Sequence, residues 1–480
     1  PIMKLLGRIY YQKKADEGSL VPYTYDIPIF IVSAMLGVPL LGTVLGQLVF
    51  GRLGDLRGRR SVYGLSLMIM VLSSLACGFS ICRTRSCVLS SLAFFRFTLG
   101  MGIGGDYPLS ATIMSEFANK RTRGAFIAAI FSMQGFGIVA SSVVTMAVTR
   151  LFEAGSQNLG ADRTPAAADI AWRVILMLGA IPAALTYYWR MLMPETARYT
   201  ALVENNVVQA AKDMEKVLEI SMSQITEDGP LPPLPPSYPL LSKEFLRRHG
   251  RDLFACSLNW FLLDIAFYAN NLLQSQIYIQ FWRIDGQNVY REAFKVAALQ
   301  AIVACCSTIP GYFFAVYFID RIGRRKIQMM GFLCMGMVYI ALGASYSYWH
   351  NHKHIGFMFL YALTFFFANF GPNTTTFIVP AELFPARFRS TCHGISGAMG
   401  KLGALVGTLG VLWASKSDED LPKVKPMRAS LLSLGAVCML GMIVTLFLTR
   451  ETKGRSLEEN EEEVSINTEM FAGTRRDQRS

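Results

Sequence analysis

Two stretches of sequence decide the fold: DLRGRR at residues 55–60 and DRIGRR at residues 320–325. Both follow the pattern Asp-x-x-Gly-Arg-Arg, and the second stands 265 residues after the first. Another pattern, a Glu followed by an Arg seven positions later, occurs at Glu116–Arg123 and at Glu382–Arg389, a separation of 266 residues. Because two independent patterns share one period, the sequence indicates two homologous halves.

Long apolar runs surround these motifs. The chain has 480 residues, of which 52% are hydrophobic and 17% charged. A run of about 20 apolar residues is long enough to cross a bilayer as a helix. We find eleven such runs, at residues 28–50, 61–80, 88–113, 124–149, 170–193, 252–280, 292–319, 327–346, 355–380, 389–414 and 427–449. The sequence therefore predicts an all-α polytopic membrane protein embedded in a lipid bilayer.

The net charge of +12 is explained by topology. Basic residues cluster in the loops around residues 52–60, 120–123, 321–326 and 387–389, and basic loops stay on the cytoplasmic side. We therefore expect these loops and the C-terminus to be cytoplasmic. A nucleic-acid partner is not expected, because no basic domain with interleaved aromatic residues is present.

The repeat also divides the chain. We assign residues 1–193 to a first bundle, 194–251 to a cytoplasmic linker with a proline run, 252–450 to a second bundle and 451–480 to a cytoplasmic tail. Two six-helix bundles related by a pseudo-two-fold axis resemble the major facilitator arrangement, whose substrate site lies between the halves. The period maps the run at 252–280 to positions largely before residue 1. We therefore expect an N-terminally truncated form with most of its first helix missing.

Ionisable residues inside a membrane are costly and are functional candidates by default. Asp106 lies in the run at 88–113, and Asp264 lies in the run at 252–280. Trp260, Asp264 and Tyr268 are spaced i, i+4 and i+8, so they line nearly one helical face. The alternative reading of these residues is a buried polar cluster that only holds helices together.

The period superposes further polar residues. Tyr107 corresponds to Asn373, and Gln134 stands about one period before Lys401. Polar groups at equivalent depths suggest one central polar site, although a single amide would more often join two helices.

The charged motifs in the loops suggest gating. Carboxylates and guanidinium groups there can pair between the halves in one access state and separate in another. The alternative is ordinary solvated loop charge. The residues to which we assign the gating role are Asp55, Arg59, Glu116, Arg123, Asp320, Arg324, Glu382 and Arg389.

The thirteen-residue block GGDYPLSATIMSE at 104–116 resembles the signature of the plant and fungal phosphate:proton symporters, and the plant plasma-membrane branch most of all. The resemblance extends over essentially the whole chain, including KLLGRIYY at 4–11. It implies proton-coupled uptake of inorganic phosphate by alternating access at the plasma membrane. It departs at the N-terminus, where the family's first helix carries an Asp-containing motif just before KLLGRIYY.

The resemblance also implies roles for particular residues. Those that resemble the family's phosphate ligands are Tyr107, Gln134, Trp260, Asp264, Tyr268 and Asn373. Asp106 and Asp264 resemble proton-coupling carboxylates, and Lys401 resembles a nearby cation.

Other classes of function are less well supported. We expect no enzyme, no cofactor and no bound metal, because no nucleophile–base constellation or metal-ligand spacing appears. A sugar or organic-anion porter of the same superfamily, a phosphate sensor and an inactive truncated form remain alternatives. A homo-oligomer and regulatory proteins at the tail are partners that the sequence leaves open. Cys82 and Cys87 could form a disulfide in an external loop.

Overall fold

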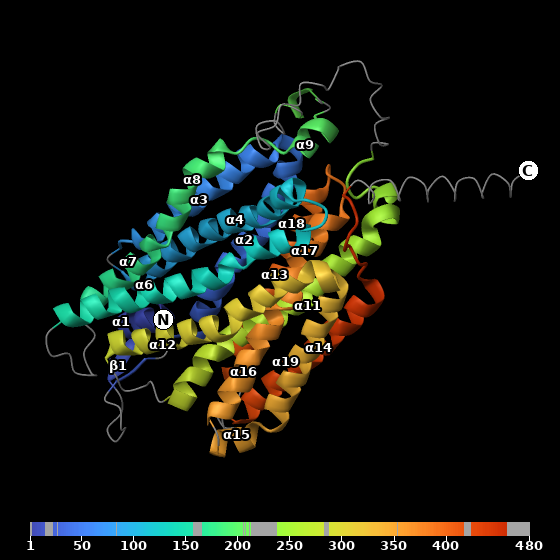
Figure 1. Ribbon diagram of the computed structural model, residues 1–480. Coiled ribbons are helices and arrows are strands. Elements are labelled where there is room, and N and C mark those ends of the chain that lie inside the picture. The colour runs from blue at the N-terminus through green and yellow to red at the C-terminus, as the bar shows by residue number, and fades with distance from the viewer. Residues whose placement is uncertain are drawn as a thin grey trace, which may run out of the picture.

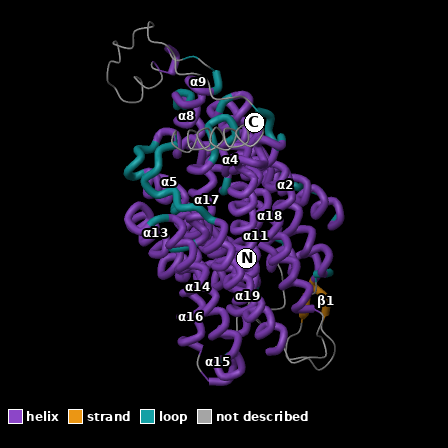
Figure 2. Tube along the Cα trace, turned by 90° about the vertical axis from the view of Figure 1, so that its right-hand side faces the viewer, coloured by secondary structure: helices purple, strands orange, loops and turns teal. Residues whose placement is uncertain are grey.

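The computed structural model describes residues 2–14, 23–25, 27–82, 84–156, 166–204, 206, 208–210, 212, 238–282, 288–352, 354–416 and 424–457. Most of the predicted proline run and nearly all of the predicted tail lie outside these residues. Two short strands, β1 (Gln12–Lys14) and β2 (Tyr23–Tyr25), pair antiparallel. Almost all of the other described residues with regular structure are helical (Figure 2).

The first half contains five of the spans that the sequence predicts. Its helices are α2 (Ile29–Arg57), α3 (Arg59–Gly78), α4 (Arg85–Phe117), α5 (Arg123–Phe131), α6 (Met133–Gly155), α7 (Ala167–Leu178) and α8 (Ala180–Leu192). Helices α5 and α6 together form one span, and so do α7 and α8. Two short helices, α1 (Ile2–Tyr11) and α9 (Ala197–Leu202), flank these spans.

The second half contains six spans. Its helices are α11 (Lys243–Trp282), α12 (Val289–Val303), α13 (Ile309–Ile322), α14 (Arg324–Ala344), α15 (Tyr346–His352), α16 (His354–Asn369), α17 (Pro372–Leu383), α18 (Arg389–Lys416) and α19 (Val424–Leu448). A π-helical turn, Ala304–Thr308, joins α12 to α13. Among the described residues, eleven helices or continuous helix pairs are long and apolar enough to cross a membrane. The predicted number of spans is therefore confirmed.

The halves form two groups of helices that meet along their length (Figure 1). Helix α18 of the second half packs against α2 and α4 of the first, while α6 packs against α12. Helix α9 lies at one end of the bundle, and β1 and α15 lie at the other (Figure 2). We call the end that carries the two Asp-x-x-Gly-Arg-Arg loops the motif end, and the opposite end the far end.

Glycines allow α2 and α4 to approach closely. A Cβ atom at Gly100 would lie 2.2 Å from the Pro39 carbonyl oxygen, and one at Gly104 would lie 2.3 Å from the Thr43 oxygen. No side chain fits in such a space, so these glycines serve helix packing. This contact fixes the position of α4, which carries Asp106 and Tyr107.

Two contacts shape the far end. Cys82 in the α3–α4 connection forms a disulfide with Cys87 in the first turn of α4, as the sequence allowed. The guanidinium group of Arg8 in α1 donates to the Glu292 carboxylate in α12 at 2.8 Å, and both side chains are buried. Helix α1 therefore links the two halves at this end.

Candidate functional site

A buried cation lies at the centre of the molecule. Helix α11 presents Trp260, Asp264 and Tyr268 along one face, and Lys401 of α18 reaches them. The Lys401 Nζ atom donates to Asp264 Oδ2 at 2.9 Å and to the Tyr268 hydroxyl at 3.0 Å. Lys401 and Asp264 are almost fully buried. A buried ammonium needs such a carboxylate, because its desolvation is costly.

A second polar cluster joins the two halves. The Tyr312 hydroxyl on α13 donates to Gln134 Oε1 on α6 at 2.6 Å. The Asn373 amide on α17 donates to the Tyr312 oxygen at 3.0 Å and to Asn369 Oδ1 at 2.8 Å. The structure thus places Gln134 and Asn373 together and adds Tyr312, which the sequence analysis missed. A tyrosine within an apolar run is only a weak sequence signal for a site residue. The signal is that a buried Tyr hydroxyl usually has a hydrogen-bond partner.

Tyr107 packs beside the first cluster and reaches Tyr312 of the second through the ring of Phe131. Its ring lies 5.2 Å from Lys401 Nζ and 6.5 Å from the Trp260 ring. It also packs edge-on against Phe131 of the first half and Phe377 of the second, whose rings stack on each other at 4.4 Å. Since Phe131, Trp260 and Phe377 all lie toward the motif end of the polar groups, we call these three rings the aromatic floor.

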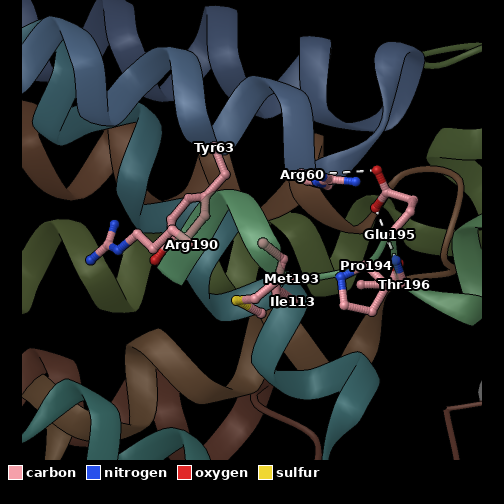
Figure 3. Close-up of a pocket in the computed structure, with 8 residues that line it drawn as sticks. All are labelled: Arg60, Tyr63, Ile113, Arg190, Met193, Pro194, Glu195 and Thr196. Atoms are coloured by element: carbon pink, nitrogen blue, oxygen red, sulfur yellow. Dashed lines mark hydrogen bonds between the residues drawn. The ribbon is translucent and has the colours of Figure 1, made fainter. Parts of the chain in front are cut away.

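Asp106 does not join the central cluster. Its carboxylate accepts a hydrogen bond from Arg190 of α8 at 2.7 Å, and the Arg190 guanidinium lies 4.6 Å from the centre of the Tyr63 ring. Arg190 and Tyr63 line a small cavity within the first half (Figure 3). Adjacent residues on a helix point about 100° apart, so Asp106 and Tyr107 cannot both face the centre. The predicted ligand Tyr107 and the predicted proton-coupling carboxylate Asp106 therefore have separate surroundings in the structure.

Two aspartates bind helix starts across the interface at the motif end. Asp55 accepts hydrogen bonds from the backbone N–H groups of Ser390 and Thr391, at 3.2 and 2.7 Å. Asp320 accepts from the backbone N–H groups of Gly124 and Ala125, at 3.2 and 2.7 Å. Each carboxylate thus stabilises the positive end of a helix in the other half.

Buried ion pairs surround these aspartates. Arg59 lies 3.3 Å from both Asp55 and Glu116, and Arg389 donates to Glu116 at 2.8 Å. In the second half, Arg324 lies 2.7 Å from both Asp320 and Glu382. Arg123 donates to the backbone oxygen of Arg455 at 3.2 Å. The eight predicted gating residues therefore lie at the motif end in two equivalent clusters, one around Glu116 and one around Glu382, which together we call the gate network.

The gate network contains residues that the sequence analysis missed. Glu195 accepts from the backbone N–H groups of Arg59 and Arg60 at 3.1 Å, at the start of α3. Figure 3 shows the contact with Arg60. Glu451 accepts from those of Arg324 and Arg325, at the start of α14. Burial raises the pKa of the Glu195 carboxyl.

A short repeated pattern could have revealed these carboxylates. Thr196 and Thr452, which follow Glu195 and Glu451, donate to Glu116 and Glu382. The sequence signal is therefore the Glu-Thr dipeptide, which occurs after the last span of each half. Glu195 and Glu451 cap α3 and α14. These helices follow Gly58 and Gly323, whose φ values of 90° and 107° favour glycine.

The central groups can together bind an oxygen-rich anion. An ammonium, two amides, an indole and three phenols converge there, with one carboxylate as the counter-charge. Among the described residues, no group of three or more His, Cys, Asp or Glu side chains is placed to hold a metal ion.

Comparisons with known proteins agree with this architecture. Residues 18–408 match the Major Facilitator Superfamily. The chain is 62% identical to the "Probable inorganic phosphate transporter 1-9" of Arabidopsis thaliana, over 97% of this chain and 89% of that protein. It is 58% identical to the "Probable inorganic phosphate transporter 1-10" of Oryza sativa subsp. japonica, over 96% and 85%.

A solved structure shows the same fold. The proton:xylose symporter XylE, 17% identical, superposes with a TM-score of 0.67 over 90% of this chain and 89% of XylE. The chain therefore belongs to the Major Facilitator Superfamily, a class of membrane porters rather than enzymes, and within it to the family of the plant inorganic phosphate transporters. The predicted family and fold are confirmed.

Proposed function

We propose that the chain takes up inorganic phosphate together with protons, across the plasma membrane, by alternating access. The observation that carries this proposal is the buried Lys401, held between Asp264 and Tyr268 and next to Tyr107. The relatives named as inorganic phosphate transporters support phosphate as the substrate.

The charge of this cluster suggests how phosphate and protons are coupled. Lys401 and Asp264 form a neutral pair in a buried site. A phosphate anion that binds Lys401 adds negative charge beside the Asp264 carboxylate, and a low-dielectric site disfavours two like charges. A proton on Asp264 removes this repulsion and frees the ammonium for phosphate. The proton and the anion therefore enter together.

Coupling to protons also offsets the membrane potential, which opposes the entry of an anion. A cell interior that is negative opposes entry of an anion by roughly 2.3 kcal/mol per charge for each 100 mV. Protons that accompany phosphate compensate for this charge. The tyrosine, indole and amide groups then bind the phosphate oxygens, while Asp106 retains its predicted proton-coupling role from a separate position in the first half.

The gate network provides the second part of the cycle. In the proposed topology the motif end and the C-terminus face the cytoplasm, because basic loops stay on that side of the membrane. Asp55 and Asp320 bind the opposite half in the closed state. In the proposed cycle these bonds break when the halves rock, phosphate and protons leave, and the bonds form again.

The test is uptake of labelled phosphate by this chain in cells that lack their own phosphate uptake. We expect entry that rises at acid pH, falls with a protonophore and is not reduced by excess hexose. Uptake that ignores pH and the protonophore would remove the proton from the proposal. Strong inhibition by hexose would favour a sugar porter, and phosphate binding without uptake would favour a sensor.

A further inference from the structure

A histidine lies between the central cluster and the gate network. His393 of α18 follows Thr391, which binds Asp55, by two residues. It precedes Lys401 by two helical turns. Its side chain is fully buried. The ring packs edge-on against Trp260 at 5.3 Å and Phe377 at 5.2 Å, so it underlies the aromatic floor.

The hydrogen bond of His393 determines which ring nitrogen is free. The Nε2 atom lies 3.0 Å from the Phe377 backbone oxygen. A carbonyl oxygen only accepts, so Nε2 carries the hydrogen and Nδ1 of the neutral ring carries a lone pair. Within the described part of the chain, this buried Nδ1 has no hydrogen-bond partner. A buried polar atom without a partner is costly and calls for a functional explanation.

Other buried polar atoms lie near His393 along α18. His393, Gly397 and Lys401 are spaced i, i+4 and i+8 along α18. The Gln47 amide of α2 lies over Gly397, where a Cβ atom would be 2.6 Å from Gln47 Nε2. Both polar atoms of that amide and the Ser390 hydroxyl are also buried without partners in the residues the structure covers. These buried polar atoms form a track, which runs from Lys401 past Gln47 and His393 to the start of α18, where Asp55 binds.

The charged groups around this track already have partners. They are Asp55 on α2 with Ser390 and Thr391, Asp264 on α11 with Lys401, Glu116 on α4 with Arg59 and Arg389, and Glu382 on α17 with Arg324. The other titratable neighbours are the buried thiols of Cys256 on α11 and Cys392 on α18. Among the described residues, each of these charged groups is paired elsewhere. The Nδ1 atom of His393 is therefore a base without a charged partner.

We propose that His393 accepts the proton that leaves the central site and passes it to the cytoplasm. This role rests on the proposed proton-coupled transport. When the Asp55 bonds at the start of α18 break, water can enter the track. The O–H bond of protonated Asp264 then breaks, and through water an N–H bond forms at Nδ1. The imidazolium next loses this proton to cytoplasmic water, and Asp264 is again ionised beside Lys401, which expels phosphate.

The test compares His393→Gln with the wild-type chain in proteoliposomes. The Gln amide can still donate to the Phe377 oxygen but cannot bind a proton near neutral pH. We expect phosphate exchange at equal pH on both sides to stay within about twofold of wild type. Net uptake driven by a pH gradient should fall about tenfold, with a flattened pH profile and an equal fall in proton entry measured with an internal pH dye.

Matched variants separate this role from folding. His249→Gln alters another buried histidine, which pairs with Tyr238 near the motif end, and should leave the pH profile unchanged. If His393→Gln does not fold, His393→Asn offers a smaller neutral amide. Wild-type net uptake and pH profile in a His393 variant would overturn the proposal. So would a parallel loss of exchange and net uptake with an unchanged pH profile. A wild-type chain that exchanges no phosphate would instead overturn the proposed function beneath it.

Discussion

The Asp55 carboxylate in the first half binds Thr391 in the second half, with its Oδ2 atom 2.7 Å from the Thr391 nitrogen and 2.6 Å from the hydroxyl. Asp320 makes the corresponding bonds to the start of α5, so the interface contains the same contact twice. Charge-assisted hydrogen bonds at a helix N-terminus are strong relative to neutral ones. Together the two aspartates join the halves at the motif end.

Asp55→Asn should open the motif end. Loss of the charged acceptor weakens two backbone hydrogen bonds and costs about 1.5–3 kcal/mol, which corresponds to a change of roughly tenfold or more in the open population. Cys392, which is fully buried next to Thr391, is a native reporter of this opening. Its labelling by a maleimide, followed by mass spectrometry, should become about tenfold faster.

The control for this labelling is Cys438, which is fully buried in α19 and should react at the wild-type rate. Asp320→Asn should accelerate Cys392 labelling in the same direction, because it releases the equivalent contact. Unchanged Cys392 labelling in both variants would show that the two aspartates do not hold the interface.

Lys401→Met should destabilise the protein, and adding Asp264→Asn to the same chain should restore most of its stability. The single change leaves the Asp264 carboxylate buried without its cation, at a cost of about 3–5 kcal/mol. The double variant removes both charges and should recover most of the lost thermal stability in detergent, while phosphate uptake stays lost. Lys326→Met alters an exposed lysine and should leave stability unchanged. Equal losses in the single and double variants would contradict this coupling.

The sequence predicts the spans well because hydrophobicity and length depend on the chain alone. It also predicts the face formed by Trp260, Asp264 and Tyr268, since their spacing within one helix determines it. By contrast, the contacts of Tyr312 and His393 depend on which helices become neighbours. The period relates equivalent residues of the two halves but does not say which side chains meet.

Asp106 illustrates the same limit. Its depth in the membrane follows from its place in the sequence, yet its direction depends on how α4 is rotated against α2 and α8. The close contact at Gly104 sets that rotation, and it leaves Asp106 beside Arg190. Glu195 and Glu451 lie beyond the spans, so a search for membrane-buried charges passes over them.

Arg8→Ala should destabilise the far end much more than Arg150→Ala. Arg8 is buried and pairs with buried Glu292, and breaking a buried ion pair costs about 3–5 kcal/mol. The Arg150 side chain is 60% exposed, and its pair with Glu153 contributes about 0–1 kcal/mol. Thermal unfolding of both variants in detergent checks this ranking. Equal effects would show that α1 does not tie the halves together.

Glu195→Gln should change how stability depends on pH. Burial raises the pKa of Glu195 in the folded protein above its ordinary value of 4.5. Below that ordinary value the group is protonated in both states. As pH rises from 4.5 to the folded pKa, the unfolded chain ionises first, so the stability contributed by the protonated group is progressively lost. Glutamine is neutral throughout, and its side-chain oxygen can still accept from the start of α3.

The unfolding temperature of Glu195→Gln relative to wild type should therefore rise with pH across this window and level off above it. Glu204→Gln, which removes a carboxylate at an exposed position in the same segment, is the matched control. If the difference between Glu195→Gln and wild type stays constant from pH 4.5 to 7, another group produces the pH dependence at this end of the molecule.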